Sequence, residues 1–257
     1  MTKQQIIQMQ QQQIRDENLL IIDSINKLRG GNLEAVAALR HDFGELYKGN
    51  IQSVEKRIGK RIRDDTLSVQ LAAVLEYYMA QSVDMAAATS GRLFCDIYNY
   101  GAVRGTTARL FGIKGQTVKD GRSMADTKEY MDACKRAGDY YVKQFTEDVK
   151  KAEIEQVQAE EMATKSMSKI GNVERVRAVT TCTKAAENVQ KSCLESANKK
   201  PERFLFVAVL DSRTTEGCRQ KHGTVYNRSE YAEGVTVPPC HWCCRSSIVW
   251  VPDDEIV

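Results

Sequence analysis

Apolar residues recur at intervals of three and four along most of the first 200 residues. This spacing places them on one face of an α-helix and predicts a series of amphipathic helices. A first helix is predicted over residues 1–29, ended by Gly30-Gly31, and a second from Asn32 to about Arg63. The pair is expected to form an antiparallel hairpin or, alternatively, a coiled-coil arm for oligomeric contacts. The apolar face of the second helix is its clearest stripe: Val36, Leu39, Phe43, Tyr47, Ile51, Val54, Ile58 and Ile62.

Further helices are predicted from the same spacing over these ranges: 67–90, 92–111, 126–169 and 173–197. Gly91 and the Ile170-Gly171-Asn172 stretch are expected to end helices, because glycine is a poor helix former and a frequent terminator. Pro201 prevents the last helix from continuing, since proline lacks the amide donor and clashes with the preceding turn.

The periodicity changes after Pro201. Residues 204–210 (FLFVAVL) form an unbroken apolar run, which predicts a buried strand, and residues 224–226 and 247–251 predict two more. The predicted fold is therefore α+β, mostly α: long N-terminal helices, then a C-terminal domain with a helix and a small β-sheet. The glycine-rich stretch 112–126 is the predicted boundary, dividing a helical region 1–114 from a domain 115–257 whose sheet and Cys/His cluster lie in 203–252.

Composition agrees with a folded soluble protein, since 42% of the 257 residues are hydrophobic and 28% are charged. The sequence has no run of 18 or more apolar residues, so no membrane span is expected. The N-terminus is polar and Gln-rich and lacks the three parts of a signal peptide. The protein is therefore expected to be made in a reducing cytoplasm, where disulfides are rare.

The charge is uneven along the chain. Residues 1–200 carry 31 Lys+Arg against 26 Asp+Glu, whereas residues 201–257 carry 6 against 8. Any electrostatic contact with DNA is therefore expected in the N-terminal part. Five cations within eight residues form the candidate DNA or partner patch, for which a solvated helix face is the alternative: Lys56, Arg57, Lys60, Arg61 and Arg63.

The C-terminal stretch concentrates the residue types that bind transition metals. Four of the eight cysteines and two of the three histidines lie between Phe204 and Val251. Two loops that close on one zinc ion would cross-link a sheet too small to stabilise itself. The expected ligands are Cys218, His241 and Cys244, with His222 or Cys240 completing the set. The alternatives are free thiols, or a Cys218–Cys244 disulfide that forms after release from the cell.

Asp211 and Arg213 lie where the buried strand ends. Residues two apart on an extended chain face the same way, so the two side chains could pair or act on a shared ligand. A structural ion pair or an Asx-type turn is the alternative. An open zinc site with Glu216 or Asp211 as the general base would make a hydrolase, but the sequence has no HExxH-type spacing to support one.

At these residues the C-terminal part resembles the Mu F-like family of phage head morphogenesis, or minor head, proteins. The family pattern is an apolar strand, an Asp-x-Arg-Thr segment with a following Cys and Gly, and Pro-Pro-x-His-x-x-Cys-Arg-Cys before a final strand. Ser246 replaces the last Cys of the pattern, which makes Cys240 and Cys243 possible substitutes. The helix around Thr180 to Asn188 resembles the Arg-Thr-Glu helix of the family. The matching motif positions are Asp211, Arg213, Thr214, Cys218, Gly223, Pro238, Pro239, His241, Cys244 and Arg245.

The resemblance covers roughly residues 115–252 and implies a virion structural protein of a tailed phage, without catalytic activity. Such proteins are implied to associate with the portal and other capsid proteins, to help procapsid assembly, DNA packaging or DNA ejection, and in some cases to bind double-stranded DNA without sequence preference. The implied location is the capsid interior or portal vertex, and the host cytoplasm during assembly. No small-molecule substrate or membrane is expected. The alternative is a metal-dependent hydrolase, nuclease or effector-type domain that uses the Cys/His cluster.

Overall fold

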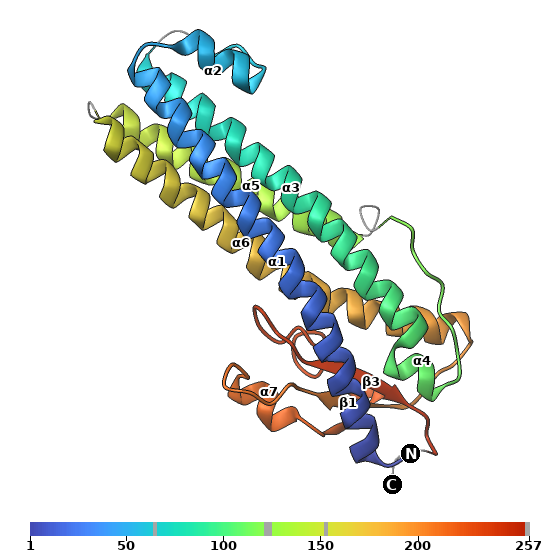
Figure 1. Cartoon of the computed structure of the whole chain (residues 1–257). Helices are drawn as coiled ribbons and strands as arrows, with labels where there is room; N and C mark the ends of the chain where they lie inside the picture. The colour runs from blue at the N-terminus through green and yellow to red at the C-terminus, as the bar shows by residue number, and fades with distance from the viewer. Residues whose placement is uncertain (64–65, 121–124, 152–153, 255–257) are drawn as a thin grey trace. The chain divides into compact units, whose positions relative to one another are not determined.

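The computed structural model describes residues 1–63, 66–120, 125–151 and 154–254. Its helices and antiparallel strands confirm the predicted α+β class with a predominance of helix (Figure 1). None of the helices in these ranges is long and apolar enough to cross a lipid bilayer. The elements are α1 (Lys3–Tyr47), α2 (Ile51–Ile58), α3 (Leu67–Arg104), α4 (Thr106–Leu110), α5 (Ala125–Lys150), α6 (Gln156–Ser196), β1 (Arg203–Val207), α7 (Glu216–Lys221), β2 (Val225–Asn227), a 3-10 turn (Arg228–Glu230) and β3 (Ser247–Val251).

The predicted helix ends at Gly30-Gly31, Gly91 and Gly171 are wrong. Helices α1, α3 and α6 continue through these positions. At Gly31 an added Cβ would lie 2.1 Å from the sulfur of Met85, and at Gly171 it would lie 2.7 Å from the amide nitrogen of Asn32. These two glycines therefore allow helices to approach closely, which a sequence pattern cannot distinguish from a helix stop.

The predicted helix from Asn32 to Arg63 is also wrong in its extent. Helix α1 ends at Tyr47, and α2 ends at Ile58, where Gly59 adopts a left-handed φ of 68° as the C-terminal cap. The predicted helix over 126–169 is likewise interrupted, because α5 ends at Lys150 and α6 begins at Gln156. Residues 121–124 of the predicted boundary stretch lie outside the described ranges.

Two compact units are built from interleaved segments of the chain. Unit 1 consists of residues 1–24, 90–128 and 176–257, and unit 2 consists of residues 25–89 and 129–175. The predicted boundary between residues 114 and 115 falls within unit 1. The division into an N-terminal region and a C-terminal domain stays a prediction.

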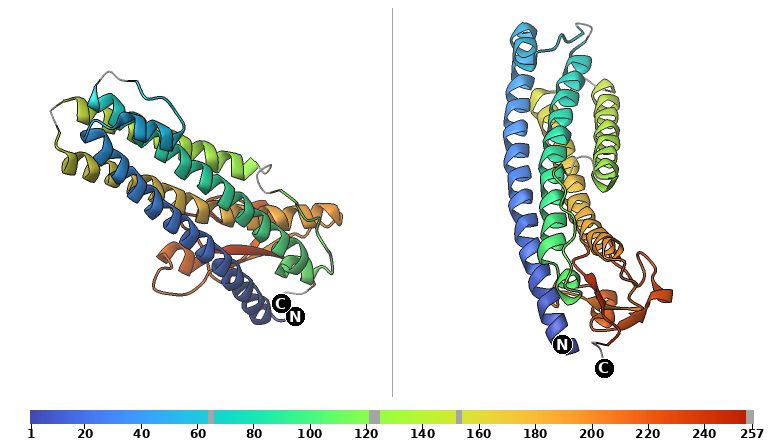
Figure 2. Two further views of the ribbon diagram at one scale, coloured as in Figure 1. Left: turned by 45° about the horizontal axis from the view of Figure 1, so that its top comes forward. Right: turned by 90° about the vertical axis from the view of Figure 1, so that its right-hand side faces the viewer.

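Unit 2 is a helical bundle whose segments lie side by side in several views (Figures 1 and 2). The stripe predicted from the sequence faces its core, since Leu39, Phe43 and Val54 are fully buried. They pack with apolar residues of α3, α5 and α6, including Leu75 and Phe145. Helical periodicity therefore identified the buried face even where it misplaced the helix ends.

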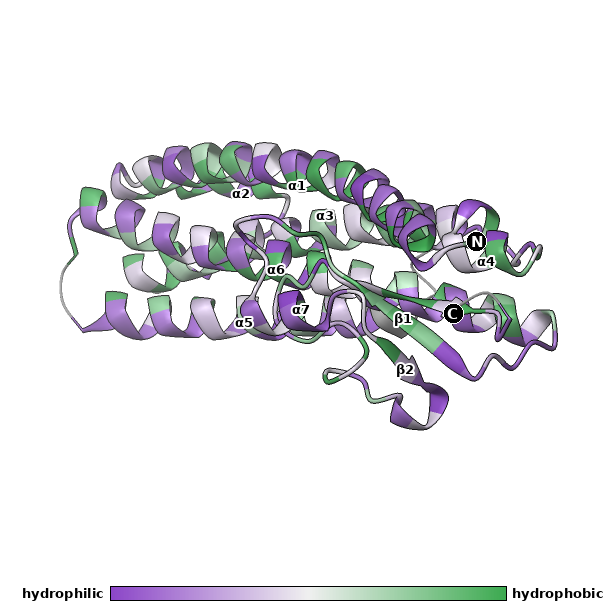
Figure 3. Ribbon diagram, turned by 90° about the horizontal axis from the view of Figure 1, so that it is seen from below, coloured by the Kyte–Doolittle hydropathy of each residue, from purple (hydrophilic) through white to green (hydrophobic). Residues whose placement is uncertain are grey.

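Unit 1 contains a three-stranded antiparallel sheet in the order β2-β1-β3. The central strand β1 is buried on both faces, because Phe204 to Val207 are fully buried. The apolar character of the strands is visible in Figure 3. One face packs on Leu194 near the C-terminal end of α6, and the other packs on Ile6, Ile7 and Ile14 of α1. The sheet core thus joins the two ends of the chain.

Candidate metal centre

The loop after β1 folds around the carboxylate of Asp211. The backbone amide of Arg213 donates to Asp211 Oδ1 at 2.9 Å, and the hydroxyl of Thr214 reaches the same oxygen at 3.2 Å. The amide of Asp211 donates to the Thr214 hydroxyl at 3.0 Å. These contacts form an Asx-type turn, which is the alternative that the sequence left open.

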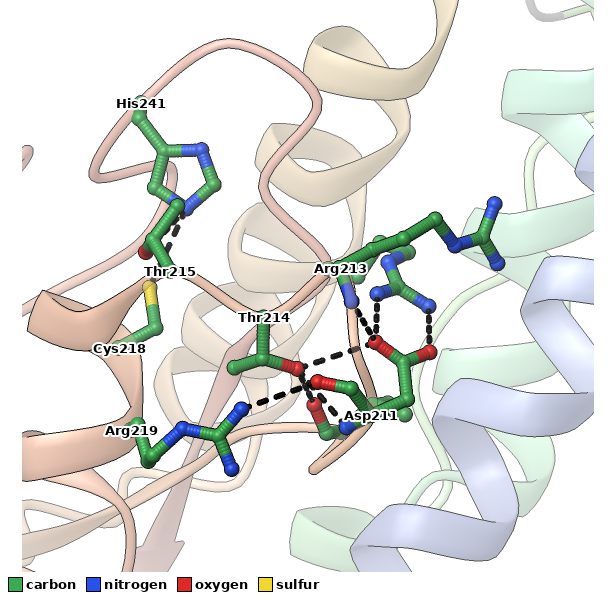
Figure 4. A network of polar contacts seen from close by, with 9 residues as sticks. Asp211, Arg213, Thr214, Thr215, Cys218, Arg219 and His241 are labelled. Atoms are coloured by element: carbon green, nitrogen blue, oxygen red, sulfur yellow. Dashed lines mark hydrogen bonds and ion pairs between the residues drawn. The ribbon is translucent and has the colours of Figure 1, made fainter.

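The predicted Asp211–Arg213 side-chain pair does not form. Arg245, from the loop before β3, instead donates two hydrogen bonds to Asp211, at 2.6 and 2.7 Å. Figure 4 shows the Arg213 side chain extending away from the Asp211 carboxylate. The guanidinium of Arg245 holds the pKa of Asp211 well below its usual range. The pair therefore cross-links the loop after β1 to the loop before β3, and it occupies the carboxylate that a hydrolase would need as a base.

Cys218 lies on α7, the short helix that follows this turn in the chain. Cys218 is buried, and α7 begins immediately after Thr215, whose backbone is extended. Gly223 follows α7 with a φ of 78°, and its amide donates to Phe206 O at 2.8 Å. A residue with a side chain rarely adopts this conformation. Glycine at position 223 therefore lets the chain turn back to the sheet without backbone strain.

The second loop, residues 238–244, brings His241 and Cys244 to Cys218. Pro238 is buried at its start, next to the half-buried Pro239. The amide of Cys244 donates to the carbonyl of His241 at 3.2 Å, which closes a tight turn. Trp242 at the tip is 60% exposed and stacks on the guanidinium of Arg177, 4.7 Å from the ring centroid.

Helix α6 holds this second loop through two threonines that were not among the predicted site residues. The hydroxyl of Thr183 donates to Cys244 O at 2.6 Å, and the amide of Cys243 donates to the Thr180 hydroxyl at 3.3 Å. Both threonines lie in or beside the stretch that resembles the Arg-Thr-Glu helix. That resemblance was the only signal in the sequence that could have located them.

The three donor atoms have the spacing of a metal site. Cys218 Sγ lies 3.3 Å from His241 Nε2 and 3.9 Å from Cys244 Sγ, and all three atoms lie within 4.8 Å of one another. Tetrahedral zinc at its usual bond lengths separates a sulfur from a nitrogen donor by about 3.5 Å and two sulfurs by about 3.8 Å. The Cys/His group can therefore hold a metal ion of this type.

The imidazole of His241 is oriented for ligation by Nε2. Its Nδ1 lies 2.9 Å from the carbonyl of Trp242, so a proton on Nδ1 can be donated to that oxygen. Nε2 then carries the lone pair, and Thr215 Oγ1 lies 3.1 Å from it. A carbonyl that fixes the tautomer in this way is the usual support of a metal-ligating histidine.

Cys240 contacts two of the three donor residues but lies outside the group of atoms that are within 4.8 Å of one another. Hydrogen bonds to Cys218 and Cys244 raise the pKa of the half-buried Cys240 thiol. Hydrogen bonds from Cys240 and Cys244 hold the pKa of Cys218 well below its usual range, so the cluster favours one thiolate, the form that binds metals. The hydroxyl of Ser246, at the position of the missing family cysteine, also hydrogen-bonds to Cys218.

His222 and Cys243 lie away from the donor group. His222 Nδ1 accepts a hydrogen bond from the backbone amide of Ala208 at 3.1 Å, and burial lowers the pKa of its imidazole. The thiol of Cys243 is exposed on a residue with a φ of 58°. Of the two alternatives for completing the ligand set, Cys240 hydrogen-bonds to Cys218 and Cys244, whereas His222 hydrogen-bonds to the backbone of Ala208. Which of them is a ligand stays a prediction.

The five predicted basic residues are all exposed, in the last turn of α2 and the segment after it. Arg57 forms an ion pair with the fully buried carboxylate of Asp42. Tyr78 donates to the same carboxylate at 2.7 Å. Arg57 thus neutralises a buried carboxylate of unit 2. Binding of DNA or a partner by the other four residues stays a prediction: Lys56, Lys60, Arg61 and Arg63.

Residues 143–249 match the family model described as Phage Mu protein F like protein. The match confirms the resemblance over this part of the chain, which includes the end of α5, all of α6, strands β1 and β2, the start of β3 and the donor group. No curated protein and no solved structure matches the chain significantly.

Proposed function

We propose that the chain is a structural protein of a phage head, bound to the portal, that aids procapsid assembly, DNA packaging or DNA ejection. The proposal rests on one observation: the family motif residues connect two loops of the sheet instead of converging on an open reaction centre. Asp211 is engaged by Arg245, and among the described residues the donor group contains no carboxylate. This arrangement supports a structural role over the hydrolase alternative.

The location is tested by isolating procapsids. We expect the chain to co-purify with the portal protein, and to be lost from procapsids that lack the portal. Procapsids that retain the chain without the portal would contradict the assignment to the portal, and its complete absence from procapsids would contradict the assignment to the phage head.

We further propose that Cys218, Cys240, His241 and Cys244 bind one zinc ion. The donor spacing and the orientation of His241 support this. Metal analysis of the purified protein should find about one zinc per chain, which Cys218→Ser and Cys244→Ser remove. Cys243→Ser is the matched control, because this thiol is exposed and outside the donor group. Zinc content that is unchanged in Cys218→Ser would contradict the site.

The hydrolase alternative predicts a different result for His241→Ala. A structural zinc site predicts a loss of stability in this variant and no turnover of nucleic acid or ester substrates by the native protein. A variant that keeps its fold but loses a nuclease or hydrolase activity of the native protein would favour the enzyme. Melting temperature and turnover must therefore be measured on the same samples.

We also propose that the basic patch binds DNA phosphates. Its exposed cations Lys60 and Arg61 support this proposal. Affinity for double-stranded DNA should fall steeply with salt, and Lys60→Glu with Arg61→Glu should weaken binding and flatten the salt dependence. Lys143→Glu with Lys150→Glu is the control, because it changes the net charge equally at exposed sites on α5. Equal losses in the two double variants would contradict a localised patch.

A further inference from the structure

A groove runs along the seam of α1 and α6 within unit 2, with a volume of about 580 Å³. The two helices run in opposite directions there. Asn32 hydrogen-bonds to Glu174 at 3.3 Å, and Arg40 hydrogen-bonds to Thr164 at 3.1 Å. The ends of the groove are therefore defined, with residues near 29 on α1 opposite residues near 175 on α6.

The groove combines apolar and cationic side chains. Its apolar lining runs from Ile25 to Val36 on α1, and the side chain of Leu33 is 71% exposed. The end near residues 29 and 175 also carries the two cations Arg29 and Arg175, both exposed. Among the described residues, the lining contains no aspartate or glutamate. A concave surface with an exposed leucine and unbalanced positive charge is typical of a binding site rather than of a solvated helix face.

The groove is open at Gly30. This residue lies in the lining, and an added Cβ there would meet nothing within 4 Å. The lining of α1 extends over residues 25–36, which corresponds to a length of about 16 Å, or roughly three helical turns. These dimensions suit a short helical segment.

We propose that this groove binds an acidic amphipathic segment of another protein of the phage head. Apolar side chains of the segment would cover Leu33 and Val36, and its carboxylates would pair with Arg29 and Arg175. Charge complementarity selects this occupant, because the described residues that line the groove beside Arg29 and Arg175 include no carboxylate. The inference rests on the proposed function, to which it adds the chemistry of the partner.

A photocross-linking amino acid in place of Leu33, in the full chain during head assembly, tests the proposal. The cross-linked peptide, identified by mass spectrometry, should come from another head protein and contain apolar residues with an excess of Asp and Glu. Arg29→Glu with Arg175→Glu should reduce the cross-link at least fivefold. The same photocross-linking amino acid at Val157, which is 65% exposed and outside the lining, should not cross-link to that peptide.

Several outcomes would overturn the proposal. They are a cross-link to a second copy of this chain, a cross-link to a basic or uncharged segment, and a yield that charge reversal leaves unchanged. Lys143→Glu with Lys150→Glu, at exposed positions of α5 outside the lining, changes the net charge equally and should leave the yield unchanged. If the chain is present in heads but gives no cross-link from position 33, the groove proposal fails alone. If the chain is absent from heads, the proposed function fails.

Discussion

At the scale of single residues, Asp211 and Arg245 join two loops that are 34 residues apart in the sequence. Arg245 donates two hydrogen bonds to the one carboxylate, and charge-assisted pairs of this kind are stronger than hydrogen bonds between neutral groups. The side chain of Asp211 is 36% exposed and that of Arg245 is 17% exposed, so solvent screening reduces the contribution of the pair. The pair nevertheless holds the two loops that carry Cys218 and His241.

Asp211→Asn should therefore lower the free energy of unfolding by about 1–2 kcal/mol, because it removes the charge from a bidentate pair. Urea unfolding followed by the fluorescence of Trp242 and Trp250 measures this change, since both tryptophans lie in unit 1. Arg213→Met is the control, with an expected change within about 0.5 kcal/mol. A larger loss for Arg213→Met than for Asp211→Asn would contradict the assigned pairing.

Two carboxyl groups in unit 1 are buried without an ion pair to Lys or Arg among the described residues. Glu17 is 7% exposed and accepts a hydrogen bond from Gln13, and Glu187 is 4% exposed and accepts from Ser247 and the amide of Ile248. Desolvation raises the pKa of Glu17 to about 7 and that of Glu187 to about 8, from 4.5. In the folded state Glu187 is therefore mostly protonated at neutral pH, and Glu17 is about half protonated there.

The stability of unit 1 should accordingly fall as the pH rises from about 5 to about 8. The folded state binds more protons than the unfolded state over this range, so raising the pH favours unfolding by on the order of a few kcal/mol. Glu187→Gln should flatten this dependence, whereas Glu195→Gln, at an exposed position of α6, should not. Urea unfolding at several pH values measures it, and a stability that rises over this range would contradict the assignment.

At the scale of elements, the first turns of α1 complete the core of the sheet. Ile6 and Ile7 pack on the face formed by Leu205, Val207 and Val249. The side-chain amide of Gln11 donates to Ala208 O at 3.2 Å, at the end of the central strand. An N-terminal helix segment is thus part of the core that supports the donor group.

Ile7→Ala should destabilise unit 1 by about 2–4 kcal/mol, because Ile7 is 6% exposed and its truncation leaves a cavity against the sheet. Leu19→Ala, on the same helix at 66% exposure, should cost no more than about 0.5 kcal/mol. Tryptophan fluorescence during urea unfolding distinguishes the two variants. Equal effects would show that α1 does not cover the sheet in solution.

At the scale of the whole molecule, the residues that match the family model do not coincide with either compact unit. Residues 143–249 include parts of both units but lack the first segment of α1. A fragment of residues 143–257 should therefore unfold without cooperativity and bind zinc more weakly than the full chain, because one face of its sheet is uncovered. Circular dichroism and metal titration measure these properties. A fragment as stable as the full chain would contradict the role of α1.

The sequence by itself determined the features that depend on local spacing along the backbone. The apolar period of three and four identified the buried face that includes Phe43, and the apolar run after Pro201 identified the central strand. The clustering of thiol and imidazole residues identified the donor group.

Tertiary structure alone decided which residues meet. It paired Asp211 with Arg245 instead of Arg213, placed Cys240 rather than His222 beside Cys218, and made Gly31 a point of close packing instead of a helix end. Each outcome depends on a contact between segments distant in sequence, where the free energy of packing outweighs the local preference of the backbone.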